Sequence, residues 1–597
     1  MSAARRRIVL AQLPIPPLGP APIRGNVPLA AAYLKLFAEQ QGLGDRFDIE
    51  ILPAADANAL GDRALAAAIA ERDPWLVGFT CYVWNIERTL WICGELKRRR
   101  PATRIMLGGP EITADNQWVL ESPDYDFAAI GEGEQTFAEF LAREHQSSSR
   151  LSLPMFDTAI AGLYLPPESG PRFDPARKPP FRSPMPDINR LGSPYLAGIL
   201  DAADEKMLLL ETTRGCVFNC KFCYYPKSYD QQYFLSPELV RAGLRHAVDR
   251  GVEEVFLLDP TLNQRKDFAD LLRLLAEENP GRRFKYFGEL RAEGITEKTA
   301  RLLRDANFAE VEVGLQSIGR DAMNLMDRNN NLRAFERGVR AMMAEGIEVK
   351  VDLIIGLPGD TVDSIRRGMN YLREGGLYSD VQVFNLAVLP GTAFRQEAEQ
   401  LGLRFQPRPP YYVTRTQALQ AEDLFALMQE AQDIFEVDFD APPPPVLDDL
   451  PADAICRVDL DLGEEFRPPS VERRRQAFTL WVRSRDLEAN NRRIAAMVAH
   501  LMEENPFTTL QLILEPTADA DWRDLNPAAF DPIVRACRSN PTYLDKFYAL
   551  QPGEPRGAKR IVLLLPGDLR GRMPPDWFEE MAANIGTIVW NEPVGSA

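Results

Sequence analysis

Short apolar runs alternate with longer amphipathic stretches along residues 1–145. The apolar runs lie at Arg7–Gln12, Phe47–Leu52, Trp75–Thr80, Arg104–Leu107 and Asp126–Ile130. The stretches with helical spacing of apolar residues lie at Leu29–Gln40, Asp62–Glu71, Ile86–Arg98 and Glu134–Arg143. Strand and helix at this rhythm predict a parallel, doubly wound, Rossmann-like sheet, with ligands at the carboxyl ends of its strands.

A second and more regular series occupies residues 207–407. Its apolar runs lie at Met207–Leu210, Val255–Leu258, Phe284–Phe287, Val311–Leu315, Val349–Ile355 and Val381–Val388. Its helical patterns lie at Pro237–Arg250, Phe268–Glu277, Glu297–Asp305, Leu332–Glu345 and Val362–Glu374. Strands and helices in this order predict a (β/α)6 partial barrel, whose active site lies where the strands end.

The remaining stretches have weaker patterns. Residues 146–206 are rich in proline and turn residues, which predicts a linker. Residues 408–597 open with a helical stretch and the prolines Pro442–Pro445. Strands are expected at Phe478–Val482, Thr509–Leu514, Arg560–Leu565 and Gly586–Trp590. We therefore expect a small C-terminal α/β domain, serving as a cap or a substrate domain, and an α/β fold throughout.

Composition narrows the classes of protein that fit. The chain has 597 residues, which is too long for one core, and a formal net charge of -17, which argues against a nucleic acid as the main partner. No apolar run approaches the length of a membrane span. The chain has seven cysteines, an odd number, and its first residues do not resemble an export signal. These features predict a protein of the reducing cytoplasm that neither crosses a membrane nor binds nucleic acid.

One segment carries a specific chemical signal. Cys216, Cys220 and Cys223 fall within eight residues, just after the first strand of the predicted barrel. Thiolates are the ligands of iron–sulfur clusters, and three of them leave one iron of a cubane open to another ligand. A structural zinc site would need a fourth ligand, and the nearest histidine, His246, lies inside a predicted helix. The reducing compartment and the odd count disfavour a disulfide.

The spacing Cys-x3-Cys-x2-Cys, with an aromatic residue before the last cysteine, resembles the radical S-adenosylmethionine (SAM) superfamily. The resemblance implies that Cys216, Cys220 and Cys223 hold a [4Fe–4S] cluster whose open iron is chelated by SAM. Segments at the ends of the later strands resemble the family's SAM contacts less specifically. They supply Tyr224, Asp259, Thr261, Glu289, Arg291, Gln316, Asp352, Gly356 and Pro390 as candidate cofactor-binding residues.

Two residues are candidates for a catalytic role, each with alternatives. Glu289 is an acid at a strand end, and it could bind the ammonium group of SAM, lie near the open iron or cap the next helix. Tyr411 belongs to an aromatic segment that follows the last barrel strand. That segment could cover the active site, or it could pack as a hinge between domains.

The N-terminal unit resembles the cobalamin-binding domain of class B radical SAM enzymes. The resemblance is carried by Leu107–Glu111 and Ile130–Glu134, and it implies cobalamin contacts at Gly108, Gly109, Glu111, Gly131, Glu132 and Gly133. Glycines would let a bulky nucleotide tail pass close to the sheet. The alternative is a nucleotide-binding or ligand-free flavodoxin-like unit.

The N-terminal unit differs from many cobalamin-binding proteins in the loop after its first strand. The loop Leu13–Asn26 contains no histidine to bind cobalt from below. The loop after the third strand is the next candidate, with Tyr82, Trp84 and Asn85. Tyr82 and Trp84 should point to the same side, because alternate residues of an extended segment do so. We predict that Trp84 packs under the corrin; the alternative is a core position against the next helix.

The resemblance implies a methyltransferase that moves a methyl group from SAM through methylcobalamin to a carbon, or another poor nucleophile, of a small molecule or peptide. It also implies an electron donor such as a flavodoxin or ferredoxin. Tyr411-Tyr412 and Tyr543–Lys546 suggest the tryptophan 2-C-methyltransferase-like subgroup of peptide natural-product biosynthesis. Two alternatives remain open: a cobalamin-dependent rearrangement or cyclisation without methyl transfer, and a non-catalytic cobalamin or redox sensor.

Overall fold

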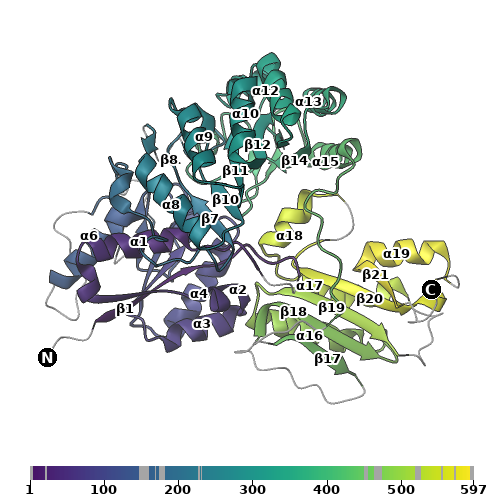
Figure 1. The fold of residues 1–597 in the computed structure, drawn as a ribbon. Helices are drawn as coiled ribbons and strands as arrows, with labels where there is room; N and C mark the ends of the chain where they lie inside the picture. The colour runs from purple at the N-terminus through teal and green to yellow at the C-terminus, as the bar shows by residue number, and fades with distance from the viewer. Residues whose placement is uncertain are drawn as a thin grey trace.

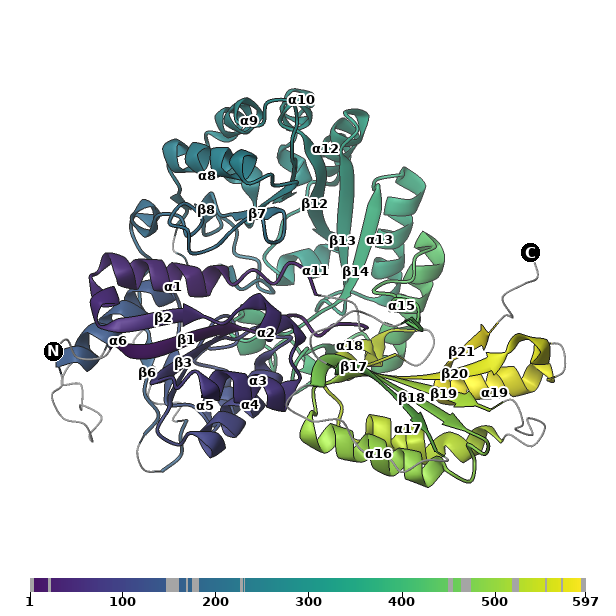
Figure 2. The ribbon, with the colours of Figure 1, turned by 60° about the horizontal axis from the view of Figure 1, so that its bottom comes forward.

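The computed structural model describes residues 5–19, 23–146, 160–167, 170–173, 182–225, 229, 231–448, 455–462, 474–517, 526–552, 556–570 and 573–591. These residues form three α/β units. In Figures 1 and 2 the middle unit lies above the N-terminal unit (purple to blue) and the C-terminal unit (green to yellow). No helix in the described ranges has both the length and the apolar character needed to cross a membrane.

The N-terminal unit is built on a sheet with the strand order β2-β1-β3-β4-β5-β6. Its parallel strands are β1 (Arg6–Gln12), β2 (Phe47–Ile51), β3 (Leu76–Thr80), β4 (Arg104–Gly108) and β5 (Phe127–Ala129). The predicted Rossmann-like sheet is confirmed. The structure adds β6 (Leu163–Tyr164), which pairs antiparallel to β5 and comes from the stretch expected to be a linker.

Helices cover both faces of this sheet. They are α1 (Leu29–Gln40), α2 (Ala54–Ala59), α3 (Asp62–Glu71), α4 (Ile86–Arg99), α5 (Gln117–Leu120) and α6 (Gly133–Gln146). In β1, Ile8 and Leu10 belong to the core under α1 and α6, whereas Val9 and Ala11 belong to the core under α3 and α4. A strand buried on both faces reads as a continuous apolar run, which is the pattern that the sequence shows.

The middle unit is the predicted (β/α)6 partial barrel. Its strands are β7 (Met207–Leu210), β10 (Glu254–Leu257), β11 (Lys285–Leu290), β12 (Phe308–Gln316), β13 (Glu348–Ile355) and β14 (Asp380–Asn385). Every neighbouring pair is parallel, and strand order in the sheet follows the order in the chain. Right-handed crossovers then place the helices on one face and leave the other face as the barrel interior. The last strand ends at Asn385 rather than at Val388.

Several barrel helices begin at a residue whose side chain caps the first turn. They are α8 (Pro237–Asp249), α9 (Phe268–Glu277), α10 (Glu297–Ala306), α12 (Leu332–Ala344) and α13 (Val362–Gly375), with the short α11 (Arg320–Leu325) and α14 (Ala393–Gln396). Ser236, Thr296 and Thr361 each accept a hydrogen bond from a backbone N–H of the first turn of α8, α10 and α13. Such caps satisfy donors that a helix start leaves free.

The C-terminal unit is a parallel sheet in sequential order. Its strands are β17 (Ile455–Asp461), β18 (Arg474–Ser484), β19 (Thr509–Pro516), β20 (Lys559–Pro566) and β21 (Gly586–Asn591). Its helices are α16 (Asn491–Glu504), α17 (Asp531–Arg538) and α19 (Pro575–Ile585), while α15 (Ala421–Phe435) leads from the barrel into this unit. The short α18 (Tyr543–Phe547) lies between the C-terminal sheet and the barrel (Figure 1). The sequence predicted all of these strands except β17.

Two short antiparallel strand pairs lie outside these three sheets. β8 (Thr213–Arg214) pairs with β9 (Tyr233–Phe234) on either side of the cysteine segment. β15 (Arg404–Phe405) pairs with β16 (Val413–Arg415) after the last barrel strand.

Candidate functional site

The three motif cysteines lie on the loop after β8 and line a single cavity at the carboxyl ends of the barrel strands. The predicted residues that share this cavity with Cys216, Cys220 and Cys223 are Thr261, Glu289, Arg291, Gln316 and Asp352. These side chains come from segments far apart in the chain, and the barrel brings them together where such folds place their active sites.

The surroundings of the thiols suit ligands of a cluster. Cys216 Sγ lies 3.7 Å from Thr261 Oγ1, and Arg328 Nη1 lies 3.9 Å from Cys220 Sγ. In the described part of the chain, no three His, Cys, Asp or Glu side chains form a group that would hold a single metal ion. A cubane cluster does not need such a group, because each thiolate binds a different iron atom. The donor set therefore fits a three-cysteine cluster with one open iron.

The cysteine loop is held by the residues just before it. Gly215 has φ +90°, and a Cβ there would lie 2.2 Å from the carbonyl oxygen of Gln231, so only glycine fits this turn. The guanidinium of Arg214 pairs with Glu132 at 3.0 Å, Glu134 at 3.0 Å and Glu211 at 2.8 Å. Because Glu132 and Glu134 belong to the N-terminal unit, this buried cluster ties that unit to the start of the cysteine segment.

Acidic side chains dominate the barrel side of the cavity. Burial and the nearby Glu312 raise the pKa of Glu289 to about 7, and burial with Glu312 and Glu289 raises the pKa of Asp352. Asp352 Oδ1 and Gln316 Oε1 are buried without a hydrogen-bond partner. Unpaired buried acceptors are costly, so this cluster fits a ligand that carries a positive charge and several donors. Glu312 was not predicted as a site residue, although it alternates with Val311 and Val313 along β12.

Other predicted SAM contacts lie outside the cavity wall. The carboxylate of Asp259 accepts hydrogen bonds from the backbone N–H of Thr212 (3.1 Å) and the hydroxyl of Thr212 (2.6 Å). Gly356 lies near Leu424, Leu386 and Val413. Tyr224 lies beside Gly391, the neighbour of Pro390. A role in SAM binding stays a prediction for Tyr224, Asp259, Gly356 and Pro390.

The N-terminal sheet carries a narrow, mostly apolar slot at its carboxyl edge. Gly78, Gly108, Gly109, Gly131 and Gly133 line it, together with Thr80 and Glu134. A Cβ on Gly109 would lie 2.7 Å from the carbonyl oxygen of Cys81, and its φ is +104°. Glycine is therefore required at Gly109 for the close approach of two loops, and a slot edge built of residues without Cβ fits the passage of a nucleotide tail.

The loop after β3 has the predicted orientation at two positions. The rings of Tyr82 and Trp84 stack with centroids 4.5 Å apart and planes 7° apart, so they share one side as predicted. The predicted reason is wrong, because the segment is a turn and not extended: the backbone N–H of Asn85 donates to the carbonyl oxygen of Tyr82 at 3.1 Å. Asn85 is buried, and its amide donates hydrogen bonds to the carbonyl oxygens of Leu13 (3.0 Å) and Thr80 (3.2 Å). Its side chain holds the loop in place. Corrin contacts of Tyr82, Trp84 and Asn85 stay predictions.

Tyr411, the second predicted catalytic residue, lies at the junction of two units. It is fully buried, and its hydroxyl donates a hydrogen bond to Glu111 at 2.7 Å and accepts one from Trp118 at 3.1 Å. Burial raises the pKa of Glu111 to about 7, against the opposing effect of the Tyr411 hydrogen bond. Tyr411 does not line the cysteine cavity. It joins the barrel to the N-terminal unit, and its catalytic role stays a prediction.

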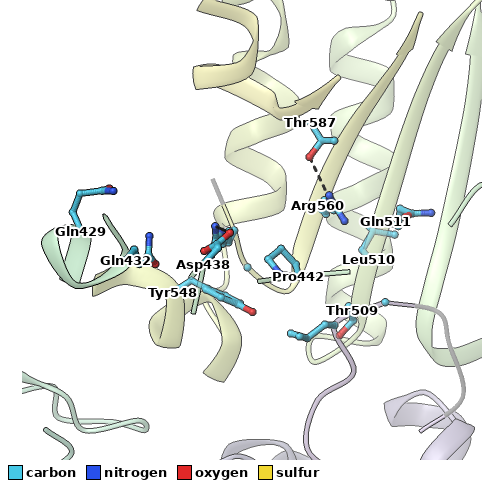
Figure 3. Close-up of a pocket in the computed structure, with 14 residues that line it drawn as sticks. Gln429, Gln432, Asp438, Pro442, Thr509, Leu510, Gln511, Tyr548, Arg560 and Thr587 are labelled. Carbon is cyan, nitrogen blue, oxygen red and sulfur yellow. Dashed lines mark hydrogen bonds and ion pairs between the residues drawn. The ribbon is translucent and has the colours of Figure 1, made fainter. Parts of the chain in front are cut away.

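A polar hollow of about 400 Å³ lies away from the cysteines (Figure 3). Gln432, Asp438, Tyr548 and Arg560 line it, and the guanidinium of Arg560 donates a hydrogen bond to Thr587 at 3.3 Å. It opens beside the first residues of β19 and β20. Ligands of parallel sheets bind at the opposite, carboxyl ends, so we do not assign the reaction to this hollow.

Two family models match the chain. The Radical SAM superfamily model matches residues 210–372, and the B12 binding domain model matches residues 26–141. The first range contains the cysteine cavity, and the second contains the glycine-lined slot.

Curated relatives and solved structures agree with these matches. TokK of Streptomyces tokunonensis, a cobalamin-dependent radical SAM methyltransferase, is 27% identical over 64% of this chain and 57% of its own length. The 2-(S-pantetheinyl)-carbapenam-3-carboxylate methyltransferase of Streptantibioticus cattleyicolor is 25% identical over 64% of this chain and 57% of its own length. The chain thus spans little more than half the length of these two relatives.

The structural likenesses concern the fold. The radical SAM methyltransferase TsrM of Kitasatospora setae, solved with tryptophan substrate and a SAM analog, has a TM-score of 0.53 at 18% identity, covering 69% of this chain and 80% of TsrM. The cobalamin-dependent SAM radical enzyme OxsB has a TM-score of 0.57 at 14% identity, covering 72% of this chain and 67% of OxsB.

Proposed function

We propose that this chain, which combines a B12 binding domain with a radical SAM domain, is a cobalamin-dependent radical SAM methyltransferase acting on a small molecule or a peptide. One observation carries the proposal. Arg214 lies two residues before Cys216, and its guanidinium donates a hydrogen bond to Glu134, which lines the glycine slot. The proposed cluster site and the proposed cobalamin site are therefore linked through one side chain.

Each cofactor has residues that fit it. Cys216, Cys220 and Cys223 would hold the cluster, and Glu289 with Asp352 would balance the positive charge of SAM. Gly108, Gly109, Gly131 and Gly133 would make room for the tail of cobalamin, while Tyr82 and Trp84 would lie against its ring. When bound, the cofactors supply the methyl group, its carrier and the reducing electron, and the protein orients them and excludes water.

The proposal also includes a one-electron donor, such as a flavodoxin or ferredoxin, and a cytoplasmic location, where thiols stay reduced. The curated relatives support methyl transfer over a rearrangement or cyclisation, since both are named methyltransferases. A cobalamin or redox sensor would not use up SAM.

Turnover with SAM carrying a deuterated methyl group tests the proposal. The anaerobically reconstituted full chain, given cobalamin and a chemical reductant, should release S-adenosylhomocysteine and add a labelled methyl group to a member of an aromatic and peptide substrate panel. The C216A/C220A/C223A variant should lose its iron and this turnover. Cys537→Ala is the matched control, because Cys537 is a buried thiol of the C-terminal unit. Release of 5′-deoxyadenosine and product without the label would support the rearrangement instead.

A further inference from the structure

A second cavity, of about 400 Å³, lies beside the cysteine loop and is lined by all three units. Val83 comes from the loop after β3, Phe222 from between Cys220 and Cys223, and Asn385 from the end of β14. Tyr412 follows the barrel, and Tyr543 and Phe547 belong to α18. The volume lies within the usual range for sites that bind small molecules, about 300–1,000 Å³.

The aromatic wall of this cavity is fixed from several sides. The ring of Phe547 lies 5.9 Å from that of Tyr412 and 6.0 Å from that of Tyr543, measured between centroids. Lys546, next to Phe547, forms an ion pair with Glu87 of α4 at 2.6 Å. The C-terminal unit therefore supplies a wall that is anchored to the N-terminal unit, directly next to the barrel opening.

Among the described residues, none of the side chains that line the cavity carries a charge. Burial raises the pKa of Tyr412 and Tyr543, so both phenols stay neutral. Transfer of a charged group into such surroundings is unfavourable unless a partner compensates it, and no charged partner lines this wall. The cavity therefore selects for uncharged, apolar groups.

One polar atom in this wall lacks a partner. Asn385 is 5% exposed, and its Nδ2 has no hydrogen-bond partner within the described part of the chain. Asn385 is the last residue of β14, the outer strand of the barrel sheet, where it pairs in register with Ile355. A buried amide donor without an acceptor is costly to the fold, and Asn385 lies at the carboxyl end of a barrel strand, where such folds bind their ligands.

We propose that this cavity binds the methyl acceptor, and that the acceptor presents an uncharged, flat apolar group whose carbonyl-type oxygen accepts a hydrogen bond from Asn385 Nδ2. This inference rests on the proposed methyltransferase function and adds the class of substrate. A free amino acid, charged at both ends, fits this wall less well than a neutral ring that carries an amide, ester or ketone.

Binding of three matched probes tests the inference without turnover. Naphthalene-2-carboxamide is neutral and carries an acceptor, naphthalene-2-carboxylate is charged, and naphthalene has no acceptor. Each is titrated by ligand-observed NMR into the full chain with its cluster and cobalamin reconstituted, without SAM or reductant. We expect the carboxamide to bind at least about tenfold more tightly than the carboxylate.

Variants then identify the contact. Asn385→Ala should weaken carboxamide binding about fivefold, the value of one neutral hydrogen bond, and leave naphthalene binding unchanged. In Asn385→Asp the ionised side chain cannot donate a hydrogen bond, so this variant should weaken carboxamide binding at least as much as Asn385→Ala. Val83→Trp, which fills the cavity, should weaken the binding of all three probes. Gln429→Ala is the control, because Gln429 lines the polar hollow instead.

The opposite results would overturn the inference. They are equal affinity for the amide and the carboxylate, unchanged carboxamide binding in Asn385→Ala, or tighter binding in Asn385→Asp, which would indicate a donor on the ligand. The two proposals fail separately. Selective probe binding without S-adenosylhomocysteine release counts against methyl transfer alone. Release of S-adenosylhomocysteine without selective binding counts against the acceptor cavity alone.

Discussion

Arg214→Met should loosen the junction between the N-terminal unit and the barrel. The Arg214 side chain is 7% exposed, and its partners Glu132 and Glu134 are each 9% exposed. Methionine preserves much of the side-chain volume but leaves the carboxylates without their cation. Removing one partner from a buried ion pair costs about 3–5 kcal/mol. With a slope of about 2–3 kcal/mol per molar urea, the first unfolding midpoint should fall by about 1–2.5 M.

The same variant should show a defined pH dependence. Burial already raises the pKa of Glu132 and Glu211 in the presence of Arg214, and loss of the cation should raise them further. A carboxyl whose folded pKa lies above its unfolded value holds its proton more tightly in the folded state, so stability falls as the pH rises between the two values. The deficit of Arg214→Met relative to wild type should therefore be smaller at pH 5 than at pH 8.

Urea unfolding of the full chain at both pH values, followed by intrinsic fluorescence, measures these effects. Arg241→Met is the control, because Arg241 pairs with Glu277 and Glu278 on the surface. Iron content after anaerobic reconstitution reports on the cysteine loop, which begins two residues after Arg214. Equal midpoints for Arg214→Met and Arg241→Met would refute the assignment of Arg214 as the residue that holds the two units together.

Three further predictions follow from the geometry. Gly109→Ala should abolish the cobalamin spectrum and lower the melting temperature, because its Cβ would meet Cys81 backbone atoms at 2.7 and 2.8 Å, whereas Gly42→Ala, with open space around it, should keep the spectrum. The pKa of Glu111 is raised from 4.5 to about 7 in the folded chain, so the free energy of unfolding should decrease as the pH rises from about 4.5 to 7. Glu111→Gln should remove this decrease. An unchanged slope of melting temperature against pH in the variant would contradict the prediction. Asn385→Leu should raise the melting temperature, because it removes a buried donor without a partner. The expected gain in the free energy of unfolding is about 1 kcal/mol. A lower melting temperature would mean that the amide has a hydrogen-bond partner in the folded chain.

The sequence was sufficient for most strands, because strands buried on both faces, such as Leu76–Thr80, give continuous runs, while barrel strands such as Asp380–Asn385 alternate buried and more exposed residues. Runs such as Leu76–Thr80 and Met207–Leu210 are continuous and apolar, so they stand out from the helices between them. β17 was missed because Arg457, Asp459 and Asp461 alternate with its apolar residues, as on an edge strand with polar side chains outward. β6 consists of Leu163 and Tyr164 alone, too short for any periodicity to appear.

The site was predictable where a local spacing carries the chemistry, and less so where distant segments meet. The three cysteines needed nothing beyond their own segment. Glu312 and Asn385 could not be chosen from sequence, because one strand reveals which of its faces is buried but not what lies across the barrel. Tyr411 was left between an active-site cover and a hinge; its hydrogen bond to Glu111 at 2.7 Å joins the barrel to the N-terminal unit, and its catalytic role stays a prediction.

The position of α18 divides the proposed acceptor cavity between two distant parts of the chain. Val83, Phe222 and Asn385 lie before Arg408, whereas Tyr543 and Phe547 lie more than a hundred residues later. Recombination within the last third of the gene can therefore reshape one wall of this cavity while Asn385 is kept, provided that the Lys546–Glu87 pair is retained as the docking point. Chimeras joined after the barrel are accordingly the natural starting point for redirecting the reaction to other molecules.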